Sequence, residues 1–267
     1  MADPMAKAPL LQIDVITKYF GGLCAVKGFS LDLPEGALWG LIGPNGAGKT
    51  TVFNLITGLI QLSSGRIVFA DERIDGLEPY EITRMGIART FQNIRLFSNL
   101  SVLDNVRIAY HAHAGYGLTD SILRTGKFAA KEKELTDQAL DFLSIFKLEG
   151  IAEEIGKNLP YGEQRRVEIA RALACNPRVL LLDEPAAGMN PREIIELMDL
   201  IHFIRDRFKL TILLIEHQMR VVMGICERIT VMDFGEVIAR GTPREIQGNQ
   251  TVIEAYLGKG VASSAAG

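Results

Sequence analysis

Short segments in which apolar and polar residues alternate stand near the N-terminus. Leu11–Val15 and Gly28–Leu33 both show this period of two, and Ser64–Phe69 is a third candidate. Alternation places the apolar side chains on one face, which is typical of half-buried strands in an antiparallel sheet. These segments therefore predict one small antiparallel sheet at the start of the chain.

Continuous apolar runs of strand length follow at wider intervals. Such runs are typical of strands that are covered on both faces, as in a parallel sheet. Between them the apolar spacing becomes helical, for example over Thr51–Leu59. Buried strands that alternate with helices predict an α/β core. The runs are Ala37–Ile42, Val179–Leu182, Thr211–Ile215 and Ile229–Met232.

The middle of the chain, from about 99 to 174, has a different pattern. Lys131–Leu148 carries apolar residues at helical spacing opposite a charged face, and a further helix is expected at Arg165–Ala174. The stretch His111–Gly126 contains three glycines and is interpreted as a loop or insertion. The sequence thus predicts a helical subdomain within the α/β core. The apolar positions of the first helix are Leu135, Ala139, Phe142, Leu143 and Phe146.

A glycine-rich loop joins the first buried run to the helix after it. Gly43–Thr50 spells G-P-N-G-A-G-K-T, a complete G-x-x-x-x-G-K-T phosphate-binding motif. Glycines let successive backbone N–H groups face phosphate oxygens, and the helix N-terminus favours negative charge. We expect Lys49 to reach the β- and γ-phosphates and the Thr50 hydroxyl to bind Mg²⁺. The nucleotide-binding residues expected here are Gly43, Pro44, Asn45, Gly46, Ala47, Gly48, Lys49, Thr50 and Thr51.

The second buried run ends in two carboxylates, Asp183 and Glu184. Carboxyl ends of parallel strands share one edge of the sheet, where such folds bind their ligands. Asp183 suits the coordination of Mg²⁺, and Glu184 suits the orientation or deprotonation of an attacking water. The alternative is a pair of solvated acids at a strand end. With the phosphate loop, the two acids predict hydrolysis of a nucleoside triphosphate.

Composition and charge exclude several other classes of protein. A formal net charge of −3 and a pI of about 5.9 show no excess of basic residues of the kind that binds nucleic acid. Three cysteines without C-x-x-C spacing argue against a disulfide framework or a zinc site. No apolar run approaches the roughly 20 residues that span a bilayer, and the N-terminus lacks signal-peptide features. We expect a cytosolic protein that serves any membrane process as a peripheral partner.

Several further motifs, in this order, resemble those of the ATP-binding subunits of ABC transporters. Phe20 is similar to the aromatic residue that stacks on adenine, and Gln92 to the Q-loop glutamine that touches Mg²⁺ and senses the membrane partner. Leu159–Arg166 stands at the place of the ABC signature, and Ala187–Asn190 resembles the D-loop. His217, after an apolar run, resembles the switch histidine. Each residue alone has an ordinary structural explanation, and their common order carries the resemblance.

The resemblance covers nearly the whole chain and implies a fold. It implies an α/β P-loop NTPase core of the RecA-like type, with a small antiparallel β-subdomain and an inserted helical subdomain. We expect a single ABC ATPase domain at 10–260, with the core at 10–95 and 176–260 and the helical subdomain at 96–175. The tail at 261–267 is expected to be disordered. The implied cofactors are ATP and Mg²⁺.

The resemblance also implies partners, a peripheral place at the cytoplasmic face of the inner or plasma membrane, and a mechanism. The partners are transmembrane permease subunits, a second ATPase subunit (a paralogue or a copy) and indirectly a solute-binding protein, with no nucleic acid. In a head-to-tail dimer, each ATP lies between Gly43–Thr51 of one subunit and Gly162 of the other. Lys49 neutralises charge on the γ-phosphate, Glu184 acts on water, and His217 holds the γ-phosphate and the water in line. The implied metal ligands are Thr50, Gln92 and Asp183.

The signature segment departs from the common L-S-G-G-Q form. Pro160, Tyr161 and Glu163 replace the serine, the first glycine and the glutamine, while Gly162 is kept. In the D-loop, Asn190 stands where many relatives carry aspartate. These changes either weaken an ATP-bound dimer or mark a subfamily. We favour a subfamily, because the runs L-P-Y-G-E-Q-R-R-V-E-I-A-R-A-L, D-E-P-A-A-G-M-N-P, E-H-Q-M and I-E-A-Y-L-G resemble the branched-chain amino-acid importer ATPases.

The function predicted from the sequence is therefore the ATP-hydrolysing motor of an importer for branched-chain amino acids. One alternative is the ATPase of a lipid or lipopolysaccharide exporter, and another is a weakly active ABC binding subunit. A non-transport ABC protein acting on DNA or ribosomes is disfavoured because the chain lacks basic arms and a second nucleotide domain. Apolar residues that flank Gln92 predict a docking groove for a membrane subunit, or else they pack under the helical subdomain. They are Phe91, Ile94, Leu96 and Phe97.

Overall fold

The computed structural model describes residues 9–111 and 126–256 of the 267-residue chain. The expected tail at 261–267 and most of the expected loop at 111–126 lie outside the described residues. The chain forms two compact units. The core unit combines the residues up to Arg89 with those from Arg178 onward, and the helical unit is Thr90–Pro177.

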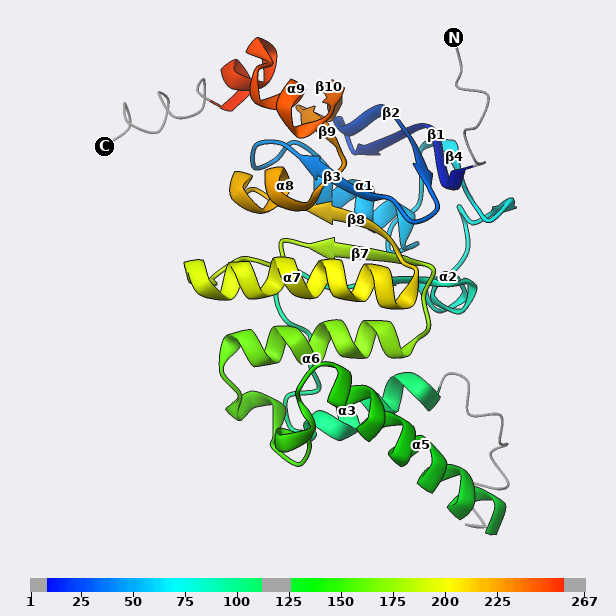
Figure 1. Ribbon diagram of the computed structural model, residues 1–267. Helices are drawn as coiled ribbons and strands as arrows, with labels where there is room; N and C mark the ends of the chain where they lie inside the picture. The colour runs from blue at the N-terminus through cyan, green and yellow to red at the C-terminus, as the bar shows by residue number, and fades with distance from the viewer. Residues whose placement is uncertain (1–8, 112–125, 257–267) are drawn as a thin grey trace. The chain divides into compact units, whose positions relative to one another are not determined.

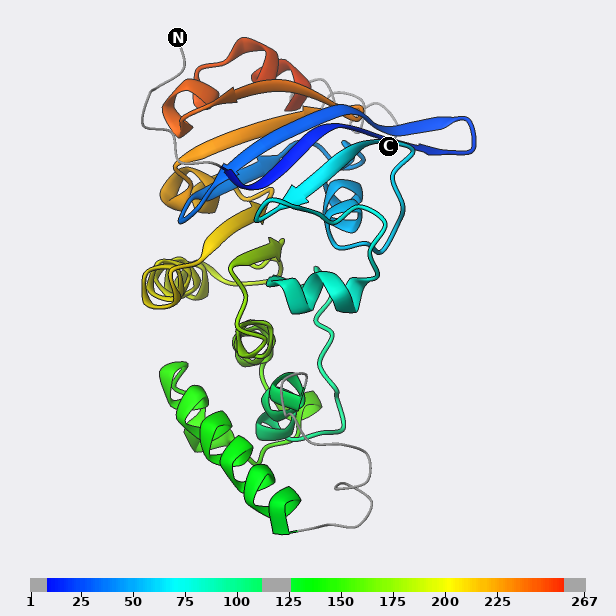
Figure 2. The same cartoon turned by 90° about the vertical axis from the view of Figure 1, so that its right-hand side faces the viewer.

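An antiparallel sheet in the core unit has the strand order β2-β1-β4-β5. Figure 2 shows its longest part, the β1–β2 hairpin drawn in blue. The three alternating segments of the sequence all lie in this sheet, so its prediction is confirmed. Its strands are β1 (Pro9–Phe20), β2 (Leu23–Pro34), β4 (Ser64–Phe69) and β5 (Glu72–Arg73).

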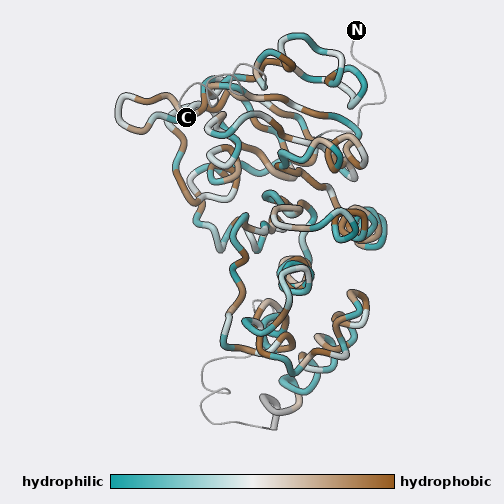
Figure 3. The backbone as a smooth tube through the Cα atoms, turned by 90° about the vertical axis from the view of Figure 1, so that its left-hand side faces the viewer, coloured by the Kyte–Doolittle hydropathy of each residue, from teal (hydrophilic) through white to brown (hydrophobic). Residues whose placement is uncertain are grey.

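A second sheet of the core unit has the order β10-β9-β3-β8-β7-β6. Strand β10 pairs antiparallel with β9, and the other pairs are parallel. The four predicted apolar runs form β3, β7, β8 and β9, and these strands are coloured mainly as hydrophobic in Figure 3. The strands are β3 (Leu38–Ile42), β6 (Ile87–Arg89), β7 (Val179–Asp183), β8 (Thr211–Ile215), β9 (Arg228–Asp233) and β10 (Glu236–Gly241).

The register of the parallel strands aligns their carboxyl ends. Ile215 of β8 pairs with both Leu41 of β3 and Asp183 of β7, and Ile42 pairs with Val231 of β9. The segments that follow β3, β7 and β8 therefore leave the sheet at the same edge. This edge is where an open α/β sheet places its ligand site.

Helices accompany this sheet in the core unit (Figure 1). The first ends at Ile56, before the predicted Leu59, because the Thr57 hydroxyl bonds the Phe53 carbonyl at 2.8 Å and Gly58 turns left-handed with φ 69°. A large apolar cluster joins residues of both sheets with the first helix. The helices are α1 (Lys49–Ile56), α2 (Pro79–Met85), α7 (Pro191–Phe208), α8 (Met219–Ile225) and α9 (Pro243–Gln247), and residues 250–256 are also helical.

The helical unit consists of α3 (Val102–His111), α5 (Gly126–Ile145) and α6 (Tyr161–Ala174). All five apolar positions predicted for the helix of this region are buried. Helix α5 ends three residues before the predicted Leu148, because Lys147 adopts φ 57° and the Leu148 N–H bonds back to Leu143. None of the helices in the described part of the chain is long and apolar enough to cross a bilayer.

Candidate nucleotide-binding site

The phosphate loop leaves β3 at the aligned edge and enters α1. Gly43 has φ 150°, and a Cβ there would stand 2.0 Å from the carbonyl oxygen of Met232. Gly48 has φ 100°, and its Cβ would stand 2.5 Å from the carbonyl oxygen of Ala25. Only glycine fits at either position. Gly48 is the N-cap residue of α1 and provides no side-chain cap, as suits a helix that receives a phosphate at its N-terminus.

Lys49 is buried in the curve of this loop. Its Nζ donates to the carbonyl oxygen of Gly43 at 2.7 Å and to that of Pro44 at 3.0 Å. The loop itself is fixed because the Ala47 N–H donates to Pro44 and the Ala47 carbonyl accepts from Gly235. The ammonium group is therefore held inside the loop, where a charge would meet bound phosphates.

Asp183 ends β7 with its side chain 2% exposed. Arg89, at the end of β6, donates from Nη2 to Asp183 Oδ2 at 2.6 Å and from Nη1 to Asn54 Oδ1 at 2.7 Å. Sequence reasoning missed Arg89, because nothing in the periodicity of the chain indicates that β6 lies beside β7. The proposed metal-binding aspartate is thus one half of a buried ion pair.

Glu184 and His217 come together at the same edge. Glu184 Oε2 lies 3.5 Å from His217 Nδ1, with the glutamate mostly buried and the histidine half exposed. Glu184 has a left-handed backbone, φ 46°, and its N–H donates to the carbonyl of Ile215 at 2.9 Å. Such backbone strain in a residue other than glycine is found preferentially at functional sites.

Glu216 connects the backbone at His217 with that of Ala186, which directly precedes the D-loop segment Ala187–Asn190. Sequence reasoning missed this residue. The side chain is fully buried. It accepts the N–H of Ala186 at 2.7 Å, of His217 at 3.1 Å and of Gln218 at 3.3 Å. Gln218 in turn donates to the Ala186 carbonyl at 2.9 Å. Burial raises the pKa of Glu216, although these donors and the charge of His217 oppose the shift.

Asn190 of the D-loop segment caps helix α7. Its side-chain oxygen accepts the N–H groups of Arg192 and Glu193, and the Glu193 carboxylate accepts the N–H of Asn190. Asparagine and aspartate are about equally good caps. The replacement of aspartate by Asn190 therefore keeps this structural role.

Gln92 and Gly162 belong to the helical unit. Gly162 lies in the first turn of α6, which begins at Tyr161 rather than at the predicted Arg165. Pro160 supplies the residue before the helix, and the Tyr161 hydroxyl lies 3.0 Å from Arg165 Nη2, one turn on. Pro160 and Tyr161 thus start the helix earlier than the apolar spacing indicated.

The signature helix is tied to the Q-loop by a buried ion pair within the helical unit. Arg165 and Glu168 are 0% and 1% exposed and lie 2.6 Å apart. Arg165 also donates to the carbonyl oxygens of Phe91 at 2.7 Å and Gln92 at 2.9 Å. Glu168 accepts the N–H groups of Phe91 and Arg95. The backbone of the Q-loop is therefore held by two side chains of α6, which sequence reasoning missed.

The remaining predicted residue, Phe20, ends β1 at the tip of the β1–β2 hairpin and is exposed. The Lys18 ammonium lies 5.0 Å from the centre of its ring. An accessible aromatic face of this kind suits stacking on a base. Of the other loop residues, Asn45, Gly46 and Thr50 are exposed and Ala47 is buried.

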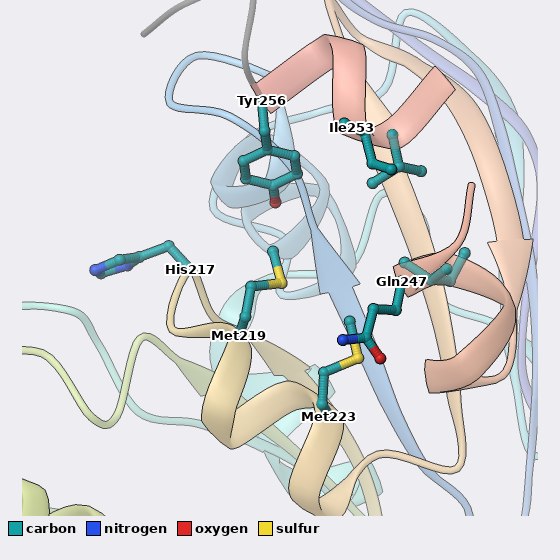
Figure 4. Close-up of a pocket in the computed structure, with 8 residues that line it drawn as sticks. His217, Met219, Met223, Gln247, Ile253 and Tyr256 are labelled. Atoms are coloured by element: carbon teal, nitrogen blue, oxygen red, sulfur yellow. The ribbon is translucent and has the colours of Figure 1, made fainter. Parts of the chain in front are cut away.

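An apolar pocket of about 390 Å³ lies beside His217 in the core unit. Met219 and Met223 of α8 line it together with Ile253 and Tyr256, while the imidazole of His217 points away (Figure 4). Burial raises the pKa of Tyr256 to about 12. The pocket offers almost no polar surface, so it is not the nucleotide site.

The donor chemistry at the aligned edge fits Mg²⁺. Thr50 supplies a hydroxyl and Asp183 a carboxylate, and Mg²⁺ prefers oxygen ligands. Within the described residues, no group of three or more His, Cys, Asp or Glu side chains is placed to hold a metal ion.

Comparison with known proteins identifies the family of the chain. A family model described as ABC transporter matches residues 26–187, and one described as branched-chain amino acid ATP-binding cassette transporter matches residues 236–262. The high-affinity branched-chain amino acid transport ATP-binding protein LivG of Salmonella typhimurium is 46% identical over 94% of this chain and 98% of its own. The lipopolysaccharide export system ATP-binding protein LptB of Escherichia coli is more distant, 36% identical over 91% and 95%.

Solved structures show the same fold. The ATP-binding cassette MJ1267 in its ADP conformation has a TM-score of 0.82 and 31% identity, over 94% of this chain and 100% of that one. The dimeric cassette MJ0796 has a TM-score of 0.73 and 28% identity, over 88% and 99%. The predicted P-loop core is thereby confirmed. The chain belongs to the ABC transporter family of nucleotide-binding ATPases, in the branch of the branched-chain amino acid transport ATP-binding proteins.

Proposed function

We propose that this chain is the ATP-hydrolysing motor of an importer for branched-chain amino acids. The observation that carries the proposal is the meeting of Lys49, Asp183, Glu184 and His217 at one edge of the parallel sheet. The solute class is supported by the 46% identity to LivG and by the match at residues 236–262. The same likeness supports a place at the cytoplasmic face of the membrane, on permease subunits that a solute-binding protein supplies.

The geometry suits hydrolysis in which the protein positions the reactants. Lys49 and the loop amides stabilise the negative charge of the γ-phosphate, as expected for phosphoryl transfer. Thr50 and Asp183 would hold Mg²⁺, which would neutralise charge on the phosphates. Glu184 orients and deprotonates the attacking water, and His217, 3.5 Å away, keeps that water in line.

The second half of the site is proposed to come from another ATPase subunit. Gly162 stands in the first turn of α6, and a helix N-terminus attracts phosphate. The structure of MJ0796 is dimeric, which supports a pair of ATPase subunits here. The pair proposed is head-to-tail, with either a copy or a paralogue as the second subunit. The half-exposed apolar residues Phe91, Ile94 and Leu96 and the exposed Phe97 support a docking surface for a permease subunit.

The replacement Glu184→Gln tests the catalytic assignment. We expect the purified variant to retain ATP and to lose hydrolysis at least about a hundredfold, the lower range for removal of a general base. Glu236→Gln is the matched control, because it removes an exposed carboxylate of the same unit that pairs with Lys27. Hydrolysis at the wild-type rate by Glu184→Gln would refute the role of Glu184.

Uptake of labelled leucine tests the solute. Cells carry either this chain or its Glu184→Gln variant as the only copy of the ATPase. Uptake that requires Glu184 supports the importer. Uptake that is unchanged, together with loss of lipopolysaccharide export in the variant, would replace the importer by the exporter.

A further inference from the structure

The ion pair between Arg89 and Asp183 is deeply buried in the core unit. The two side chains are 5% and 2% exposed, whereas a pair such as Arg178 with Glu35 is half exposed. A contact of 2.6 Å places a full positive charge against the carboxylate proposed to hold Mg²⁺. A buried ion pair often contributes less to stability than a well-packed apolar pair of similar volume. The presence of this pair therefore calls for an explanation other than stability.

Arg89 is anchored independently of Asp183. Its Nη1 donates to Asn54 Oδ1 at 2.7 Å, and the guanidinium carbon lies 5.4 Å from the centre of the Phe53 ring. Both partners belong to α1, the helix that begins at the phosphate loop. These contacts, with the ion pair to Asp183, hold the guanidinium between α1 and the end of β7.

A fixed cation changes what a divalent metal ion meets at this edge. Without nucleotide, the carboxylate of Asp183 is neutralised by Arg89, and the ammonium of Lys49 stands in the same loop region. These two cations together offset the carboxylates of Asp183 and Glu184, so a dication that arrives alone meets no net negative charge at this edge. A bound triphosphate makes the net charge at this edge negative, and its phosphate oxygens also serve as ligands for the metal.

We propose that Arg89 makes metal binding at Asp183 conditional on the nucleotide. Arg89 lowers the affinity of the site for a divalent cation alone, so that the metal enters with ATP rather than before it. The inference rests on the proposed function, because it assumes that Asp183 binds the metal of a metal–ATP complex. Arg89 is proposed as a positioning residue that acts through Asp183, the side chain it contacts.

Metal binding measured without turnover tests the proposal. The full-length chain is freed of nucleotide and metal, and Mn²⁺ binding is followed by electron paramagnetic resonance of the free ion, with and without ATP. One unit charge about 6 Å from a divalent ion alters its affinity about tenfold, even in the dielectric constant of water. We expect Arg89→Gln to bind Mn²⁺ alone at least about tenfold more tightly than the wild type. The gain should disappear in the double variant Arg89→Gln/Asp183→Asn.

Two variants separate the charge at this site from other effects. Arg178→Gln removes the same charge from a half-exposed pair with Glu35 elsewhere in the core unit, and should bind Mn²⁺ alone as weakly as the wild type. Arg89→Lys keeps the charge and should also exclude the metal. Arg89→Met, of similar length, replaces the glutamine variant if that variant does not fold.

The outcomes distinguish failure of the role of Arg89 from failure of the proposed function on which it rests. A metal-alone affinity of Arg89→Gln within twofold of the wild type, with ATP-dependent Mn²⁺ binding intact, overturns the role of Arg89 alone. A wild-type chain that fails to bind Mn²⁺ even with ATP overturns the proposed function, and the inference with it.

Discussion

Removal of Arg165 is expected to loosen the helical unit strongly, because this side chain connects α6 to the Q-loop. Arg165→Met keeps most of the side-chain volume but deletes the guanidinium. The change leaves the Glu168 carboxylate, 1% exposed, without its cation at 2.6 Å. It also removes the donor to the carbonyl oxygens of Phe91 and Gln92. The N–H groups of Phe91 and Arg95 continue to donate to Glu168.

The size of the effect follows from the burial of the pair. Loss of one partner from a buried ion pair costs about 3–5 kcal/mol, because an uncompensated charge stays in the interior. For a chain of this size, each kcal/mol lowers the melting temperature by roughly 2–4 °C. We therefore expect a fall of about 10 °C for Arg165→Met. Arg165→Met/Glu168→Met, which removes both charges, should recover part of this loss.

Thermal and urea unfolding followed by circular dichroism measure the change. Arg107→Met is the matched control, since Arg107 pairs with Asp104 at the same i, i+3 spacing in the same unit but at the surface. The control should lose less than about 1 kcal/mol. An Arg165→Met variant that loses no more than this control would show that the buried pair does not hold the Q-loop.

Two further predictions concern the core unit. Asn190→Ala removes the cap of α7 and should cost about 1 kcal/mol in thermal unfolding, whereas Asn190→Asp should cost almost nothing; equal stability of all three proteins would refute the cap. Burial raises the pKa of Cys226 to about 12. The thiolate form is then lost in the folded state, so maleimide at pH 8 should label Cys226 only after unfolding, while the half-buried Cys24 reacts first. Labelling of Cys226 at the rate of Cys24 would contradict this.

Local patterns were sufficient to predict most strands and the residues at their carboxyl ends. Apolar runs identify β3, β7, β8 and β9, and the motif identifies the loop between β3 and α1, because both signals are contained in a few consecutive residues. Strand β6 was not predicted, because its three residues, Ile87–Arg89, are too few to show a periodic pattern. Its place beside β7 depends on pairing with residues almost a hundred positions away.

The contacts that fix the site were harder to foresee than the site itself. Arg89, Arg165 and Glu216 are charged residues that sequence reasoning expects at the surface, yet the fold buries each of them. Sheet register and turns bring their partners, such as Asp183 and Ala186, close to them. Register and turns of this kind cannot be predicted from the spacing of apolar residues. The start of α6 at Tyr161 was missed for a related reason, because its first turn carries no apolar spacing.

The way the helical unit is joined to the sheet has a consequence for the variability of this family. The chain leaves the core after β6 and returns at β7, and these two strands are parallel neighbours in register from Ile87 with Val179 to Arg89 with Leu181. The Gly86 carbonyl accepts the N–H groups of both Arg178 and Val179, which pins the point of return. Residues 90–177 are thus an enlarged version of the crossover that any two parallel strands require, for which about a dozen residues suffice. Insertions and deletions within this connection, away from Gln92 and Gly162, leave the sheet register unchanged, so most of the helical unit can change in length without moving the edge that carries Lys49, Asp183, Glu184 and His217.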